Sequence, residues 1–141
     1  MRAEPAKKIA ILACMDTRLV PIRVLGLEVG DAHIIRNAGG IVTDDAIRSL
    51  AISQRRLGTE EIVLLHHTDC GMSTLHDEEF VRELESETGE RPGWAPGGFA
   101  NVDESVRESI RRIRESPFIP HKNVRGYVWA VEDGSLREVS A

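Results

Sequence analysis

Aromatic residues are scarce in this 141-residue chain, which holds two Trp, one Tyr and three Phe. No apolar run approaches the roughly 18–20 residues needed to span a bilayer. Basic residues are not in excess, because 18 Lys and Arg stand against 23 Asp and Glu. The formal charge of −5 argues against nucleic acid or an anionic membrane as the main partner. The length suffices to bury a core without disulfides, so we expect residues 1–141 to form a single domain.

Cysteine is also scarce, with two residues. Residues 1–8 lack the apolar stretch of a secretory signal, so we expect a cytoplasmic protein whose cysteines stay reduced. In such a protein a cysteine pair is better explained by metal binding than by a disulfide. A redox pair is disfavoured because the chain has no Cys-x-x-Cys motif. Two inert, buried cysteines remain the plain alternative.

Short apolar segments that are typical of strands recur along the chain. Residues 8–14 are apolar almost throughout and residues 61–67 have an apolar centre, as expected of strands buried on both faces of a parallel sheet. Further strands are expected at residues 33–37, 124–131 and 136–139, the last two joined as a hairpin.

Helical segments alternate with these strands. The expected helices cover residues 21–26, 43–58 and 73–89, followed by one that opens at Asn101, where Glu104 completes a capping-box pattern. Residues 91–100 contain two Pro and three Gly and are expected to form a loop. The alternation predicts an α/β fold with a mostly parallel central sheet and helices on both faces.

Three side chains that favour zinc follow two of the predicted strands. Cys14 ends the first strand, His67 ends the strand at 61–67, and Cys70 comes three residues later. Because ligands collect at the carboxyl ends of parallel strands, we expect these three to meet there. Two thiolates and one imidazole, with no fourth protein ligand evident, are typical of a catalytic zinc site. The adjacent His66 points to the opposite face of its strand and is expected to be structural.

Asp16 and Arg18 lie two and four residues beyond the first candidate ligand. They could form an ordinary surface ion pair, which would say little about function. Beside a metal thiolate, a functional pairing is the better interpretation. The carboxylate can accept a hydrogen bond from water on the metal, and the arginine can hold that carboxylate through two parallel hydrogen bonds.

Two glycine-containing segments flank the expected metal centre. Gly71 follows the last ligand, and its N–H could face an anion near the metal, or the glycine could serve backbone shape alone. Residues 36–40, Arg-Asn-Ala-Gly-Gly, could form an ordinary strand-to-helix turn or line the mouth of an active site. Gly71, Ala38 and Gly39 are the candidate substrate-binding residues.

Together these motifs resemble the β-class carbonic anhydrases. The matching elements, in the expected order, are Cys14-x-Asp16-x-Arg18, Gly30-Asp31 with Arg36-Asn37-Ala38-Gly39, and His67-x-x-Cys70-Gly71. The short chain and the sequence of residues 66–72 look most like a compact bacterial branch of that family. This branch is also similar to carbonyl sulfide hydrolases.

The resemblance implies zinc on Cys14, His67 and Cys70, with Asp16 and Arg18 as the catalytic dyad. It implies reversible hydration of carbon dioxide to bicarbonate by a metal-bound hydroxide, in a homodimer or larger homo-oligomer. Family members usually embrace their partner with a helical N-terminal arm that is longer than residues 1–7. Two alternatives stay open: carbonyl sulfide hydrolysis at the same zinc site, and a non-catalytic zinc-stabilised module closed by Asp16 as a fourth ligand.

Overall fold

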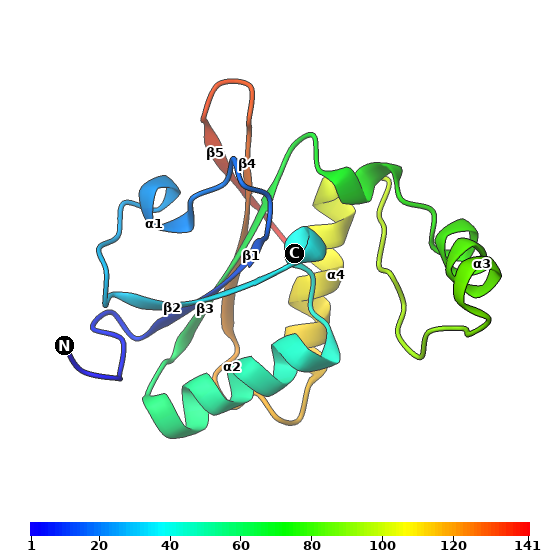
Figure 1. Cartoon of the computed structure of the whole chain (residues 1–141). Coiled ribbons are helices and arrows are strands. Elements are labelled where there is room, and N and C mark those ends of the chain that lie inside the picture. Colours follow the sequence, from blue (N-terminus) through cyan, green and yellow to red (C-terminus); the bar gives the residue numbers. More distant parts are fainter.

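A five-stranded sheet forms the centre of the computed structural model, which describes residues 1–141 (Figure 1). The strands are β1 (Ile9–Cys14), β2 (Ala32–Asn37), β3 (Glu61–His67), β4 (Asn123–Trp129) and β5 (Leu136–Val139). Their order across the sheet is β2-β1-β3-β4-β5. The first four strands are parallel, and β5 pairs antiparallel with β4. A mostly parallel sheet that ends in a hairpin is therefore confirmed.

Helices lie on both faces of the sheet, but they cover the faces unequally (Figure 1). They are α1 (Pro21–Val24), α2 (Asp44–Leu57), α3 (Asp77–Thr88) and α4 (Val102–Glu115), with 3₁₀ turns η1 (Ala38–Gly40) and η2 (Gly71–Thr74). The long helices α2 and α4 pack on one face, and only the short α1 packs on the other. Figure 1 shows α3 standing away from the sheet. None of these helices has both the length and the apolar character that a membrane crossing requires.

Capping residues set the ends of α2 and α4 where the sequence predicts them. The Thr43 side chain accepts a hydrogen bond of 3.2 Å from the first turn of α2, and Gly58 ends that helix in a left-handed conformation. The Asn101 side chain accepts a bond of 3.0 Å from the N–H of Glu104. Only half of the expected capping box forms, because the Glu104 carboxylate pairs with Arg107 instead, at 2.8 Å.

The helix α3 begins later than the sequence predicts. The expected start at Ser73 or the next residue is wrong, since α3 opens at Asp77 after a separate 3₁₀ turn. Between this 3₁₀ turn and α3, the backbone at Leu75 is extended. The Asp77 carboxylate accepts hydrogen bonds from the N–H groups of Gly97 and Gly98, at 3.1 and 2.8 Å. This tie to the returning loop fixes where α3 can start.

Each face of the sheet carries its own apolar cluster. The cluster under α2 and α4 has 14 buried residues, among them Leu12, Leu64 and Ile110. The opposite cluster has seven, and these include Cys14 and Cys70. The two candidate thiol ligands therefore belong to the smaller core, at the carboxyl end of the parallel strands.

Candidate metal centre

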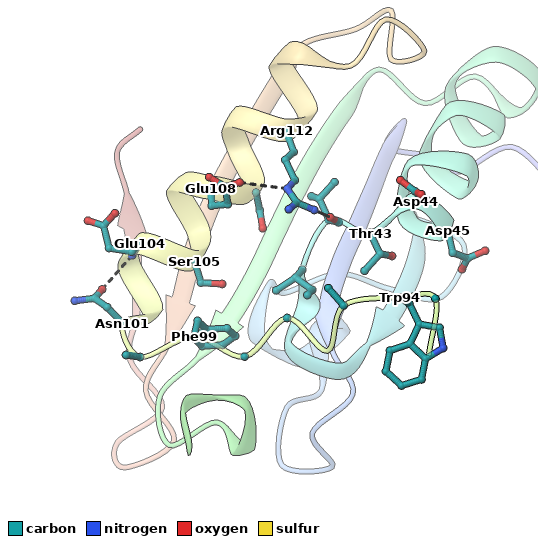
Figure 2. A pocket seen from close by; sticks show the side chains of 18 residues that line it. Thr43, Asp44, Asp45, Trp94, Phe99, Asn101, Glu104, Ser105, Glu108 and Arg112 are labelled. Carbon is teal, nitrogen blue, oxygen red and sulfur yellow. Dashed lines mark hydrogen bonds and ion pairs between the residues drawn. The ribbon is translucent and has the colours of Figure 1, made fainter. Parts of the chain in front are cut away.

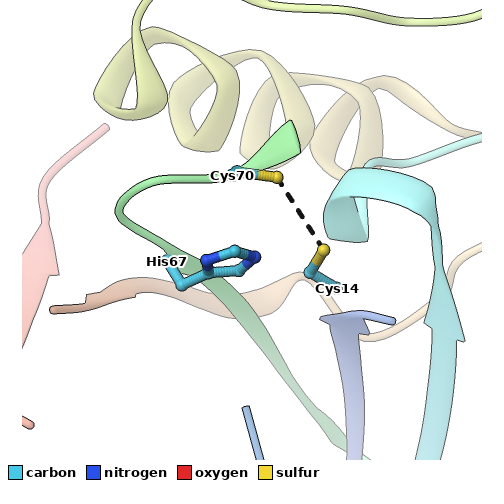
Figure 3. A group of neighbouring side chains, drawn as sticks. All are labelled: Cys14, His67 and Cys70. Atoms are coloured by element: carbon cyan, nitrogen blue, oxygen red, sulfur yellow. Dashed lines mark hydrogen bonds between the residues drawn. The ribbon is translucent and has the colours of Figure 1, made fainter. Parts of the chain in front are cut away.

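Cys14, His67 and Cys70 converge at the carboxyl ends of β1 and β3, with their side chains directed at a common point (Figure 3). Their candidate ligand atoms all lie within 4.8 Å of one another, and all three residues are buried. The strands β1 and β3 are direct neighbours in parallel register, with Ala13 opposite Leu65. The meeting of the three side chains expected from the sequence is thus confirmed.

A close approach of η1 holds the end of β1 in place. Gly40 has a φ of +65°, and a Cβ atom built there would lie 2.7 Å from the Cys14 nitrogen and 2.9 Å from the Ala13 carbonyl carbon. Contacts this short with backbone atoms leave room only for hydrogen. Gly40 therefore allows the turn after β2 to lie directly on the strand that carries Cys14.

The geometry and chemistry of the three side chains fit zinc. Two sulfurs bonded to one tetrahedral zinc at about 2.3 Å would lie roughly 3.8 Å apart, and the Cys14 and Cys70 sulfurs are 3.9 Å apart. The Nδ1 atom of His67 bonds the Thr68 carbonyl oxygen at 2.7 Å, which makes Nδ1 the protonated nitrogen. The Nε2 atom is then a free lone pair, and it is buried without a partner.

The β4–β5 hairpin positions His67 indirectly, through hydrogen bonds to Thr68. Thr68, whose carbonyl oxygen accepts the His67 bond, donates its own N–H to the Trp129 carbonyl oxygen at 3.0 Å, and its hydroxyl accepts a bond from the Val131 N–H at 3.0 Å. Its hydroxyl also donates to Glu132 at 2.8 Å. The hairpin thus fixes the carbonyl that orients the imidazole. Sequence patterns gave no signal for this support, because the hairpin is more than 50 residues away in the chain.

The two thiols differ in how readily they lose a proton, which metal binding requires. Burial opposes ionisation of the Cys14 thiol, but the nearby His67 ring and backbone N–H groups outweigh it and lower its pKa to about 7. Burial raises the pKa of the Cys70 thiol to about 11, and the neighbouring Cys14 adds to this rise. Burial also disfavours charge on His67, yet the nearby Cys14 thiol and the bond to Thr68 raise its pKa. Cys14 is therefore the thiol that ionises more readily.

Asp16 and Arg18 form the paired arrangement that the sequence predicts. The Arg18 Nε and Nη2 atoms donate to the two oxygens of Asp16, at 3.0 and 2.8 Å. This grip holds the pKa of the Asp16 carboxyl well below its usual range. The same carboxylate lies 3.7 Å from the free Nε2 atom of His67. A charged acceptor is thereby placed beside the three candidate ligands.

Arg36 on β2 holds the segment that carries Cys14 and Asp16. Its Nε and Nη2 atoms donate to the carbonyl oxygen of Cys14, at 3.0 and 2.7 Å. Its Nη2 atom also lies 2.8 Å from the carbonyl oxygens of Asp16 and Leu19. The sequence of residues 36–40 is compatible with a turn or with the mouth of an active site. The structure shows that Arg36 binds the backbone of the ligand loop.

Ala38, Gly39 and Gly71 lie on η1 and η2, beside the candidate ligands. Gly39 has a φ of +89°, and a Cβ there would come within 3.2 Å of Met72 and Phe99 side-chain atoms. Gly71 differs, because its backbone is ordinary and no atom lies within 4 Å of a Cβ built there. Within this chain, therefore, neither conformation nor packing requires glycine at position 71.

His66 packs on the side of β3 opposite to His67, as expected for a structural histidine. It is buried, its Nε2 atom bonds the Gly40 carbonyl oxygen at 3.0 Å, and its ring stacks on Phe99. Burial lowers its pKa to about 4, so the ring is neutral at ordinary pH. His66 thus braces the turn that carries Gly40.

A cavity of about 810 Å³ lies beneath the loop of residues 91–100, between the first turns of α2 and α4 (Figure 2). Its lining includes Trp94, Phe99, Glu108 and Arg112, but none of the three candidate ligands. In the wall of the cavity, the Nε atom of Arg112 donates to the Glu108 carboxylate at 3.2 Å. This cavity is therefore separate from the candidate metal centre.

Comparison with known proteins points to one family. A sequence profile described as carbonic anhydrase matches residues 9–95. The chain is 57% identical over 137 residues to beta-carbonic anhydrase 1 of Mycobacterium tuberculosis, a match that covers 96% of this chain and 84% of that protein. It is 36% identical over 153 residues to a carbon disulfide hydrolase of Acidithiobacillus thiooxidans, covering 93% and 76% of the two chains.

A solved structure shows the same architecture. The crystal structure of carbonic anhydrase from Streptococcus mutans superposes with a TM-score of 0.92 at 46% sequence identity. The alignment covers 99% of this chain and 86% of the other. Similarity of this extent includes every strand and helix described above.

Proposed function

This chain belongs to the β-carbonic anhydrase family, and we propose that it catalyses the reversible hydration of carbon dioxide to bicarbonate with zinc held by Cys14, His67 and Cys70. The resemblance inferred from the sequence motifs is thereby confirmed. The observation that carries the proposal is the convergence of two thiols and an unpartnered imidazole nitrogen within 4.8 Å, beside a restrained carboxylate.

Zinc held in this site would supply Lewis acidity that makes water a nucleophile near neutral to alkaline pH. The protein holds its ligands in a fixed geometry. Thr68 sets the tautomer of His67, and Arg36 and Gly40 fix the backbone at Cys14. These contacts preorganise the ligands, so little rearrangement is needed when the metal binds.

Asp16 is the residue that orients the attacking water. Its carboxylate is ionised at ordinary pH because Arg18 stabilises the charge, so it accepts a hydrogen bond and does not donate one. Accepting that bond turns a water lone pair toward the carbon of carbon dioxide. Both oxygens of Asp16 are already bound by Arg18, which supports an orienting role over the role of a fourth metal ligand in a non-catalytic module.

Ala38, Gly39 and Gly71 are proposed to line the place where carbon dioxide binds. They present backbone and one methyl group beside the candidate ligands, which suits a small, linear and apolar substrate. The freedom from packing around Gly71 supports this, because a missing side chain there leaves space next to Cys70.

Hydrolysis of a sulfur analogue, such as carbonyl sulfide, is the second candidate. It would use the same residues, with water attacking the carbon and hydrogen sulfide leaving. The relationship to a carbon disulfide hydrolase at 36% identity supports it. The relationship to a carbonic anhydrase at 57% identity supports the first candidate more strongly.

The proposed unit is a cytoplasmic homodimer or larger homo-oligomer. The sheet face under the short α1 is thinly covered, and apolar side chains remain exposed at both of its edges, on Ile34 of β2 and Leu136 of β5. Burying such groups between two copies is favourable. A reducing compartment is required, because the thiol sulfurs lie 3.9 Å apart and must both stay reduced to bind zinc. Sedimentation that shows an active monomer at assay concentrations would contradict the oligomer.

Steady-state assays of carbon dioxide hydration and carbonyl sulfide hydrolysis, on the same zinc-loaded sample across pH, test the function. We expect hydration to be the faster reaction and to rise toward alkaline pH. Two thiolates and one imidazole leave the metal less electron-poor than three histidines would, so its water is less acidic. Faster turnover of carbonyl sulfide would favour the second candidate, and activity with neither substrate would contradict both.

A further inference from the structure

The guanidinium of Arg18 is held from two sides by two different segments of the chain. One side is Asp16, which takes the Nε and Nη2 bonds described above. The other side is Asp69, whose carboxylate accepts from Nη1 at 3.0 Å and whose carbonyl oxygen accepts from Nη2 at 2.9 Å. All three guanidinium nitrogens are therefore engaged. The sequence motifs assigned no role to Asp69, although it lies within residues 66–72, which resemble the compact bacterial branch.

Asp69 occupies an unusual backbone position between the candidate ligands His67 and Cys70. Its φ is +51°, and the only other non-glycine residue with positive φ is Lys8. Glycine and asparagine adopt this conformation as readily as aspartate or more so, so the backbone alone does not call for a carboxylate. What the aspartate adds is the bond from its side chain to Arg18.

A second anchor for Arg18 matters because Asp16 lies so near the metal ligands. The Asp16 Oδ2 atom is 3.7 Å from the lone-pair nitrogen of His67, and a carboxylate at that distance can turn to become an additional zinc ligand. Arg18 is about half exposed and could move together with Asp16. Asp69 sits on a different loop, so its bond to Arg18 opposes that movement.

Resting on the function proposed above, we propose that Asp69 is a positioning residue. Its carboxylate anchors Arg18 from the second ligand loop, so that Arg18 keeps Asp16 in its orienting place and off the metal. The expected effect is on geometry more than on stability. The side chains of Arg18 and Asp69 are 46% and 72% exposed, and exposed ion pairs contribute little to folding.

Replacement of Asp69 by residues that suit its backbone tests this role. In Asp69→Gly the left-handed conformation is retained and the carboxylate is lost, and in Asp69→Asn one acceptor oxygen is kept. We expect Asp69→Gly to keep its zinc and its melting temperature and to lose roughly 5- to 20-fold in kcat at unchanged KM. Asp69→Asn should recover part of that loss. The matched control is Lys8→Gly, which relaxes the other left-handed residue and should leave kcat unchanged.

A double-variant cycle separates positioning from a general structural effect. If Asp69 acts through Arg18 and Asp16, then adding Asp69→Gly to Asp16→Ala should cause no further loss in kcat. The same fold loss in both backgrounds would overturn the proposal, and so would a change in KM alone or no loss at all.

Nuclear magnetic resonance of the Arg18 side chain in zinc-loaded protein gives a readout that does not depend on turnover. The Nε–H signal of Arg18 should exchange with solvent several-fold faster in Asp69→Gly than in the wild type or in Lys8→Gly. An unchanged exchange rate would overturn the anchoring, even in an active enzyme. Absence of carbon dioxide hydration in the wild type would instead contradict the proposed function, and the exchange rates would still decide whether Asp69 anchors Arg18.

Discussion

The Oδ2 atom of Asp16 lies 3.7 Å from the Nε2 atom of His67, while both oxygens of that carboxylate accept hydrogen bonds from Arg18. The carboxylate is thus close to the ligand atoms but directed by its partner. In the proposed function, this relationship makes Asp16 an orienting group and not a fourth ligand. It depends on bonds within one turn after β1 and on anchors from neighbouring strands.

Removal of the orienting carboxylate should impair turnover but not metal binding. We expect Asp16→Ala to retain zinc and to lose roughly 10²-fold or more in carbon dioxide hydration, the scale typical of a positioned acid–base or orienting group. Arg18→Ala should do similar damage, because it releases Asp16. Zinc content and rate are measured on the same samples. Near wild-type rates with zinc bound would show the pair to be only a surface ion pair, and loss of zinc from both variants would show it to be structural.

Loss of the Arg36 guanidinium should loosen the loop that carries Cys14. Arg36→Met removes the donors to carbonyl oxygens of Cys14, Asp16 and Leu19, and should lower the free energy of unfolding by about 1–2 kcal/mol. Zinc affinity should fall as well, because the Cys14 ligand is less fixed. Arg48→Met, at an exposed position on α2, is the matched control. Denaturant unfolding and zinc competition measure both effects, and equal values for the two variants would refute the role of Arg36.

Two glycine-to-alanine changes should have opposite outcomes. Gly40→Ala places a Cβ 2.7 Å from the Cys14 nitrogen at positive φ, so it should destabilise the fold by about 2 kcal/mol or more and weaken zinc binding. Gly71→Ala meets no atom within 4 Å and should leave the melting temperature unchanged. If Gly71 lines the substrate site, the same variant lowers kcat/KM. Thermal unfolding and hydration rates of both variants check this, and unfolding of Gly71→Ala would show that its glycine is needed for the fold.

Zinc affinity should rise with pH. Zinc binds thiolates, so it must displace the proton of Cys70, whose pKa is raised to about 11 by burial. Each displaced proton changes the affinity about tenfold per pH unit below the pKa of the group. Below the Cys14 pKa of about 7 the slope should steepen, as a second thiol must also be deprotonated. Competition with a chromophoric chelator between pH 6 and 9 measures the slope, and a flat profile would contradict thiolate ligation.

The sequence was sufficient to predict the sheet, the convergence of the three candidate ligands and the pairing of Asp16 with Arg18, because each is encoded locally. Apolar runs define β1 and β3, and Cys14, Asp16 and His67 follow them at fixed spacing. The anchors at Thr68 and Asp69 could not be predicted. Each depends on a partner more than 50 residues away, and polar loop residues carry no pattern that names such a partner. The late start of α3 was missed for a similar reason, since it follows from long-range bonds to the Asp77 carboxylate.

Titration of metal-free protein with zinc, followed by the rate of carbon dioxide hydration, tests the central claim most directly. The account predicts a rate that rises linearly and breaks at one zinc per chain, with no such rise in Cys70→Ser. Full activity of the protein before zinc is added, or a rate that zinc does not change, would contradict it.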